Sequence, residues 1–303
     1  MKNFCIIDLG TNTFNMLIAD PAGQRVYSEK IAVKLGKDGI NKGIITDEAF
    51  ERAIQAMMYF KEKATREDAG QIVAIATSAV RNASNGQKLM YEIFQKTGVR
   101  VKVISGLEEA ELIYKGVRAA LSLGEDISLI IDIGGGSVEF ILGDHQRMYW
   151  SQSFEIGAQR LYDLFHTSDP IPPSRVDALN EYLETELQPL FTATLLHRPI
   201  VLVGSSGTFD TLAEIDWIKK GGPLNSNTPT EYLLAQPDYQ SIAEEIIAKP
   251  REARMNIPGM IDMRVDMVVV ACVLINFIQK RLNLGDIRVS SYALKEGVLY
   301  SML

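Results

Sequence analysis

Two short segments of the chain share a pattern that could bind phosphate. Residues 7–13 read Ile-Asp-Leu-Gly-Thr-Asn-Thr, and residues 131–137 read Ile-Asp-Ile-Gly-Gly-Gly-Ser. In each, an apolar run passes through an aspartate into a glycine turn that ends at a hydroxyl residue. Such a turn exposes backbone N–H groups and lets a phosphate approach closely. Because the whole unit occurs twice, it predicts two similar half-molecules that face each other.

A third loop, residues 204–208, reads Gly-Ser-Ser-Gly-Thr and joins a predicted strand to a helix. The helix N-terminus there would add its dipole to the loop donors, which favours an anion site. The alternative is that Ser206 or Thr208 merely caps the helix. The predicted phosphate-binding residues are Gly10, Thr11, Asn12, Thr13, Gly134, Gly135, Gly136, Ser137, Gly204, Ser205, Ser206, Gly207 and Thr208.

Acidic side chains beside the two turns predict a divalent cation. Asp8 and Asp132 come at the ends of the predicted strands. Unpaired carboxylates in this position would repel phosphate, whereas carboxylates that hold a cation would attract it. We therefore expect Mg²⁺, or another hard divalent cation, at these two residues.

Arg81 and Glu109 could take part in a reaction at this phosphate. Arg81 lies just past the predicted strand 72–76, where its guanidinium could hold phosphate oxygens, with a solvated surface arginine as the alternative. Ser105 and Glu108 have the spacing of a capping box, which leaves Glu109 free in the first helical turn. A carboxylate there stays ionised, as a general base must, although it could simply compensate the helix dipole.

Alternating strands and helices must position these residues. We predict strands at 4–7, 13–19, 72–76, 101–104, 129–133, 137–142, 148–154, 200–203 and 287–290. We predict helices at 46–63, 86–97, 105–123, 158–165, 174–196, 208–219, 262–282 and 293–303, and a surface loop at 221–229.

Composition narrows the class of protein. The chain has 303 residues, of which 47% are apolar, and this length suits two domains. Its net charge of −7 argues against capture of nucleic acid or acidic membranes by the surface as a whole. Cys5 and Cys272 lie in apolar runs and read as reduced core thiols, and the apolar stretch 267–278 is too short to span a bilayer. We expect a soluble, cytoplasmic protein.

Taken together, these segments resemble the exopolyphosphatase and guanosine-pentaphosphate phosphohydrolase (Ppx/GppA) family. The resemblance implies an α/β fold that is a duplicated ribonuclease-H-like, or actin-like ATPase, fold with the active site in the cleft between two domains. It places domain I at 1–122 plus 290–303 and domain II at 123–289. The segments that carry it are 7–14, 76–81, 104–110, 131–139, 204–208 and 293–300.

The resemblance also implies Mg²⁺-dependent attack of water on a terminal phosphoanhydride. Glu109 matches the family's water-activating glutamate and Arg81 its phosphate-gripping arginine, while Asp132 and Glu139 match its acidic pair at the metal. Asn15 stands where many members have histidine. The favoured substrate is inorganic polyphosphate, with release of orthophosphate, and guanosine pentaphosphate is the alternative.

Other readings of the resemblance stay open. An ATPase or kinase of the same fold group is less favoured, and a sensor that binds polyphosphate or nucleotide without turnover is a third possibility. We expect no nucleic-acid or membrane partner, and a homodimer would suit an enzyme with such a cleft.

Overall fold

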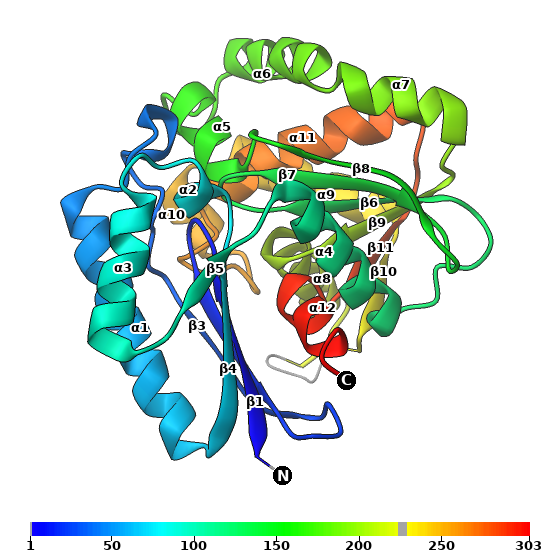
Figure 1. Cartoon of the computed structure of the whole chain (residues 1–303). Helices are drawn as coiled ribbons and strands as arrows, with labels where there is room; N and C mark the ends of the chain where they lie inside the picture. The colour runs from blue at the N-terminus through cyan, green and yellow to red at the C-terminus, as the bar shows by residue number, and fades with distance from the viewer. Residues whose placement is uncertain (1, 224–228) are drawn as a thin grey trace.

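The computed structural model describes residues 2–223 and 229–303 and contains two mixed β-sheets (Figure 1). The first has the strand order β3-β2-β1-β4-β5. Strand β1 pairs antiparallel with β2 and parallel with β4. The strands are β1 (Asn3–Leu9), β2 (Phe14–Ala19), β3 (Arg25–Ile31), β4 (Ala69–Ala76) and β5 (Val101–Val103).

The second sheet has the order β10-β11-β9-β6-β7-β8. Without the edge strand β10, its five strands repeat the order and directions of the first sheet. The repeated unit predicted from the sequence is thus confirmed, and the chain has the actin-like, duplicated ribonuclease-H-like fold. The strands are β6 (Ser128–Ile133), β7 (Val138–Gly143), β8 (Met148–Phe154), β9 (Val201–Ser205), β10 (Glu231–Leu234) and β11 (Ile287–Ser290).

The correspondence between the halves extends to single atoms in the glycine turns. The amide of Gly10 donates to the carbonyl of Thr13 at 3.1 Å, and that of Gly134 donates to the carbonyl of Ser137 at 3.0 Å. A Cβ at either glycine would lie 2.8–2.9 Å from the same carbonyl oxygen. Glycine at these two positions is therefore required by the turn itself.

Helices cover the outer face of each sheet. On the first, α1 (Asp47–Arg66) and α3 (Gly86–Thr97) pack with Cys5, Ile7 and Leu9, the alternate residues of β1 that face outward. On the second, ten of the 16 residues of α11 (Met267–Leu282) are buried, and most of these belong to a larger apolar cluster that includes Cys272. Both cysteines are free and buried as predicted, and burial raises the pKa of each thiol to about 12.

A third apolar cluster lies between the two sheets. Ile6 of β1 and Ile130 of β6, which occupy equivalent places in the two halves, share it with residues of α4 (Gly106–Ala120) and α12 (Leu294–Tyr300). Helix α12 also packs against β1 and β2, so the C-terminus returns to the first sheet (Figure 1). The domain boundaries at 122 and 290 stay a prediction.

Some predicted helices differ from those observed. The single helix predicted at 174–196 is in fact two helices that meet at Leu187. Pro189 causes the break, because proline has no N–H to donate and its ring would clash with the preceding turn of a continuous helix. The helix predicted from 262 begins at Met267, after a series of turns. In the loop predicted at 221–229, residues 224–228 lie outside the described residues.

The remaining helices complete the two layers, and several were not predicted. The predicted ones are α5 (Ala158–Phe165), α6 (Pro173–Glu186), α7 (Gln188–His197) and α8 (Gly207–Lys219). Those missed by the sequence analysis are α2 (Ser78–Arg81), the 3₁₀ turn η1 (Ile40–Lys42), α9 (Gln236–Ala248) and α10 (Arg251–Met255). Across residues 2–223 and 229–303, the structure has no helix with the length and apolar character needed to cross a membrane.

Helices α4 and α12 cross in backbone contact at a pair of glycines. A Cβ on Gly116 would collide with the carbonyl of Ala293, and one on Gly297 with the carbonyl of Leu112. The crossing matters for the site because α4 carries Glu109 and α12 carries Lys295 near their N-terminal ends.

We predict that Gly297→Ala lowers the free energy of unfolding by about 1–3 kcal/mol, because backbone must move to admit the Cβ. Urea unfolding followed by circular dichroism measures this loss. Gly285→Ala is the matched control, since its Cβ would meet nothing closer than Gln236 Oε1 at 3.7 Å. Equal losses in both variants would show that the crossing is not tightly packed.

Candidate active site

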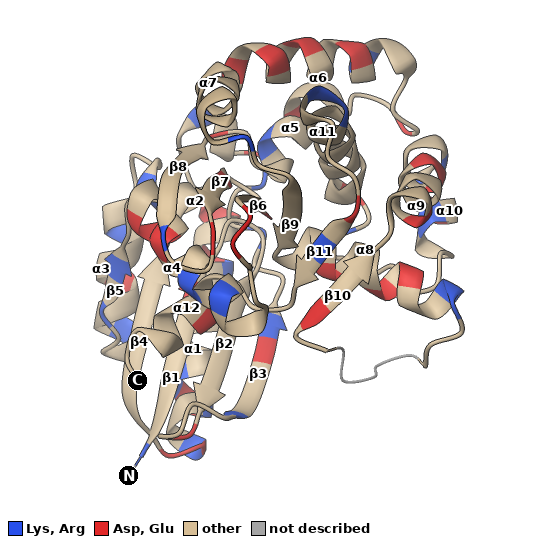
Figure 2. Cartoon of the chain, turned by 90° about the vertical axis from the view of Figure 1, so that its right-hand side faces the viewer, with Lys and Arg blue, Asp and Glu red and all other residues tan. Residues whose placement is uncertain are grey.

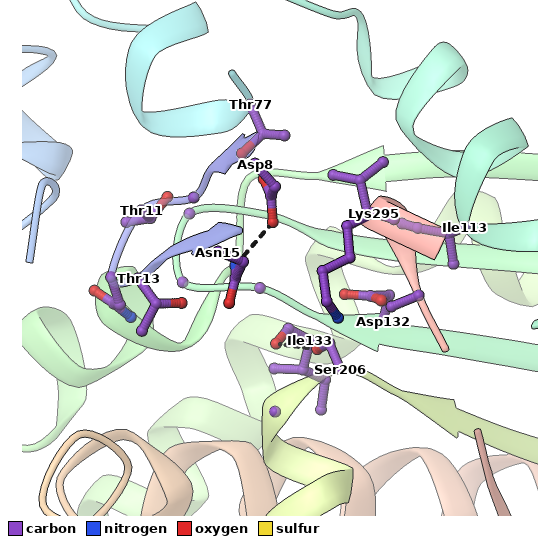
Figure 3. Close-up of a pocket in the computed structure, with 18 of the residues that line it drawn as sticks. Asp8, Thr11, Thr13, Asn15, Thr77, Ile113, Asp132, Ile133, Ser206 and Lys295 are labelled. Carbon is purple, nitrogen blue, oxygen red and sulfur yellow. Dashed lines mark hydrogen bonds between the residues drawn. The ribbon is translucent and has the colours of Figure 1, made fainter. Parts of the chain in front are cut away.

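A polar cavity of about 110 Å³ lies where the two glycine turns meet (Figure 3). It is lined by both turns, by the third loop, by α4 and by the start of α12. The predicted site residues that line it are Asp8, Gly10, Thr11, Asn12, Thr13, Glu109, Asp132, Gly134, Gly135, Gly136, Ser137, Ser206 and Gly207. The described cavity wall does not include Arg81, Glu139, Gly204, Ser205 and Thr208.

The two turns pack directly against each other. The space for a Cβ on Gly135 is filled by the Asn12 side chain, and the space on Gly136 by the hydroxyl groups of Thr11 and Ser78. Any larger residue at these two positions would push the halves apart. The halves therefore present their turns to one cavity, as the repeated sequence predicted.

Glu109 and Arg81 form a buried ion pair at the wall of the cavity. Arg81, at the end of α2 just after β4, donates through Nη1 to Glu109 Oε2 at 2.9 Å and to the carbonyl of Ile104 at 3.1 Å. Burial, and then the charge of Glu139, raises the pKa of Glu109 well above its usual value, although Arg81 opposes the shift. Glu109 thus faces the cavity, with Arg81 bonded to it. Its raised pKa differs from the sequence expectation that a carboxylate in the first helical turn stays ionised, because burial has the larger effect.

The helix cap that precedes Glu109 agrees with the sequence in part. Ser105 accepts a hydrogen bond from the amide of Glu108 at 3.1 Å, as predicted. The Glu108 carboxylate instead pairs with Lys102 on the surface. Glu108 is therefore held outside the cavity, whereas Glu109 on the next position is buried within it.

Asp8 and Asp132 occupy equivalent positions at the ends of β1 and β6. Asp8 Oδ2 accepts from Asn15 at 2.9 Å, and Asp132 Oδ2 accepts from Ser205 at 2.7 Å. Burial raises the pKa of both carboxyl groups, that of Asp8 to about 6. Asp8 Oδ1 is buried and has no hydrogen-bond partner among the described residues. Such an orphaned acceptor indicates a missing donor or cation.

Glu139 lies behind Asp132 on the neighbouring strand. The strand register pairs Asp132 with Glu139 in the second half and Asp8 with Asn15 in the first. Glu139 accepts from Ser153 at 2.6 Å, and its pKa is raised to about 7 by burial and then by Asp132. The acidic pair matched by resemblance is therefore close together, while the first half has a neutral amide at the equivalent place.

Three basic residues also line the cavity, and sequence reasoning missed them. Lys30 comes from β3, Arg264 from the turns before α11, and Lys295 from α12. Lys295 pairs with Glu296 at 2.7 Å and extends toward Asp132 in Figure 3. Acidic and basic segments lie close together around α4 and α12 (Figure 2). The three belong to separate elements, so no spacing in the sequence connects them.

Glu155 is another missed residue, and it joins the two halves. It follows β8 and accepts hydrogen bonds from Ser78 at 2.6 Å, Arg81 at 3.3 Å and Arg160 at 3.0 Å. Burial would raise its pKa, but these hydrogen bonds and charges lower it, so Glu155 stays ionised. The guanidinium of Arg81 is thus fixed between two carboxylates, one from each half.

The third loop does not follow the alternative in which the Ser206 side chain merely caps the helix. Ser206 occupies the N-cap position of α8 with φ of 68°, but its hydroxyl donates to the carbonyl of Ile133 at 3.1 Å, so its side chain makes no capping hydrogen bond. Ser205 supports Asp132 from behind the cavity. Only the Ser206–Gly207 part of this loop lies at the described cavity wall.

The donor set fits a magnesium ion. Among the described residues no three acidic, histidine or cysteine side chains form a ready-made cage. Mg²⁺, however, usually takes one or two carboxylates and completes its shell with waters and phosphate oxygens. Asp8 and Asp132 would be those carboxylates, and the orphaned Asp8 Oδ1 is the observation that agrees with this.

The chain belongs to the Ppx/GppA phosphatase family, whose sequence model matches residues 18–303. It is therefore an enzyme, a hydrolase that acts on phosphoric anhydrides.

Known relatives agree over the full length. The crystal structure of an exopolyphosphatase from Cytophaga hutchinsonii is 44% identical, with a TM-score of 0.95 over 99% of this chain and 97% of that one. Exopolyphosphatase 1 of Mycobacterium leprae is 25% identical over 98% of this chain and 88% of its own length. The Ppx/GppA enzyme of Aquifex aeolicus, 23% identical with a TM-score of 0.79 over 99% of both chains, shares the fold.

The raised pKa values predict that Mg²⁺ stabilises the protein in a pH-dependent way. With pKa values near 6 and 7, Asp8 and Glu139 hold protons more tightly in the folded chain than in the unfolded one. Their contribution to stability is therefore lost as the pH rises through this range. Mg²⁺ binds the ionised form and offsets that loss.

Adding Mg²⁺ should raise the thermal midpoint by several degrees at about pH 8 and by much less at about pH 5. Differential scanning fluorimetry with and without Mg²⁺ measures both shifts. Asp8→Asn should reduce the shift at the higher pH, and Asp68→Asn, at a surface ion pair with Lys2, is the control. A shift of the same size at both pH values would contradict a site built from these carboxylates.

Proposed function

We propose that the protein is an exopolyphosphatase that removes the terminal phosphate from inorganic polyphosphate and releases orthophosphate. The observation that carries the proposal is the position of Glu109. Its carboxylate lines a cavity formed by two facing glycine turns, which provides a base beside a phosphate cradle. The 44% identical relative named as an exopolyphosphatase supports this choice of substrate.

In the proposed reaction the terminal phosphoryl group lies between the two turns. Backbone amides of residues 11–13 and 135–137 would donate to its oxygens, with hydroxyl groups from Thr11, Thr13 and Ser137. Glu109 would orient a water molecule and accept its proton, while Arg81 fixes the position of that carboxylate. The displaced chain would leave one phosphate shorter.

In the proposed reaction, negative charge in the cavity would be balanced by a metal ion and by basic side chains. Asp8 and Asp132, with Glu139 behind them, would hold Mg²⁺, which when bound supplies positive charge to the phosphoryl oxygens. Lys30, Arg264 and Lys295 line the same cavity and would neutralise the charge of the polyphosphate chain. A cytoplasmic location is part of the proposal, since both cysteines are kept as free thiols.

Comparison of substrates tests this proposal. Phosphate release from long polyphosphate, tripolyphosphate, guanosine pentaphosphate and ATP should be measured with and without Mg²⁺. We expect long polyphosphate to give the highest kcat/KM and the metal to be required. Guanosine pentaphosphate is the second candidate, because the family description includes GppA as well as Ppx. Preference for the pentaphosphate, or conversion of ATP alone, would overturn the choice of polyphosphate.

Glu109→Gln should reduce kcat by roughly 10²–10⁴-fold, because the amide cannot accept a proton from water. The chain offers a matched control in the adjacent Glu108→Gln, which removes the surface pair with Lys102 and should leave kcat close to that of the wild type. Both variants should retain substrate binding. If Glu109→Gln kept full activity, Glu109 would not be the base, and if the wild type bound polyphosphate without releasing phosphate, a sensor would be the better reading.

A further inference from the structure

The largest fully buried side chain in the described protein is a charged one, Arg254 of α10. Its Nε donates to the carbonyl of Val265 at 3.0 Å, and its Nη1 donates to Asp169 Oδ1 at 2.7 Å and to the carbonyl of Lys249 at 2.5 Å. Burying a guanidinium is costly unless it is paired and hydrogen-bonded. An apolar side chain would fill the same space, so the cost needs an explanation.

The neighbouring contacts extend this ion pair into a small network. Asp169 Oδ2 accepts from the amide of Arg251, which fixes the start of α10. The Arg251 side chain in turn contacts Asp266 at 3.0 Å and Asp262 at 2.5 Å. Arg251 and Arg254 therefore hold the chain at residues 262, 265 and 266. We call Asp169, Arg251 and Arg254 the clamp.

The held segment has no regular structure of its own. Residues 256–266 form bends and turns between α10 and α11. Arg264 lies among the clamped positions, and its guanidinium reaches the third loop, where it fills the space that a Cβ on Gly207 would need. Arg264 and Gly207 both line the cavity. The direction of the Arg264 side chain thus depends on backbone that the clamp fixes.

We propose that the clamp positions Arg264 over Gly207 for phosphate binding, so that Arg254 and Asp169 act on substrate affinity through Arg264 without touching the substrate. This inference rests on the proposed function in that the ligand is a phosphate chain. Arg264 binds the chain and the clamp residues are positioning residues. Glycine is required at position 207, because it leaves room for the guanidinium of Arg264.

Tripolyphosphate binding with Mg²⁺ tests the inference without turnover. Isothermal titration in the Glu109→Gln background avoids hydrolysis. Adding Arg264→Ala should weaken binding by about tenfold or more, because the protein loses a charged hydrogen-bond donor to the phosphate chain. Arg254→Lys and Asp169→Asn should weaken it in the same direction, and Gly207→Ala should do so by displacing the guanidinium. In active enzyme the same changes should raise KM more than they lower kcat.

A double variant separates positioning from general loss of structure. If Arg254 acts through Arg264, adding Arg254→Lys to Arg264→Ala should change the affinity little further, whereas independent effects would multiply. Arg288→Lys is the control, because Arg288 also pairs with a glutamate (Glu231) and a backbone carbonyl but lies on β11 outside the described cavity wall. It should leave tripolyphosphate affinity unchanged.

The possible outcomes are distinct. Unchanged affinity in folded Arg254→Lys and Asp169→Asn, multiplied losses in the double variant, or an Arg264→Ala variant that binds normally would each overturn the inference. If the buried substitutions prevent folding, the half-exposed Arg251→Met decides, and normal binding by that variant would also overturn it. A wild type that binds tripolyphosphate but hydrolyses no polyphosphate would overturn the proposed function alone. The binding measurements on the variants would then still decide the role of the clamp.

Discussion

The close approach of two glycine turns is the constraint on which the rest of the structure depends. Gly135 and Gly136 leave room for Asn12, Thr11 and Ser78 from the other half, so that two separate sheets share one cavity. Phosphate recognition by backbone amides needs such proximity, since main-chain donors have no reach. The duplicated fold supplies it by placing the same strand–turn–strand unit at equivalent points of both sheets.

Two helices in the layer between the sheets add charged side chains to this cavity. Helices α4 and α12 cross at Gly116 and Gly297, and both contribute to the cavity wall, α4 through Glu109 and α12 through Lys295. The packing of that crossing therefore helps to fix the distance between the Glu109 carboxylate and the Lys295 ammonium group. A small residue in each helix therefore helps to set the positions of two side chains that line the cavity.

Electrostatics explains why so many charged groups are buried here. Asp8, Asp132 and Glu139 have raised pKa values because burial penalises their charged forms. Such a cluster destabilises the fold at neutral pH unless positive charge is near. Lys30, Arg264 and Lys295 line the same cavity and supply part of that charge, and the proposed metal ion would add to it. Arg81, fixed between Glu109 and Glu155, and Arg264, held by the clamp, show that the cations are also constrained in direction.

The sequence by itself determined the repeated turns, the strands that lead into them and the placement of Glu109 after Ser105, because these depend on local spacing and on glycine. It could not place Lys30, Arg264, Lys295 or Glu155, which come from separate elements and meet only through tertiary packing. Prediction from the sequence also gave one helix where the structure has two that meet at Leu187, and it missed β10 and α9. Hydrophobic periodicity alone does not reveal such helix breaks and short elements. Only the tertiary structure decided which predicted residues face the cavity. Ser205 and Glu139, for example, lie next to Asp132 but are not part of the cavity wall, because both are buried behind it.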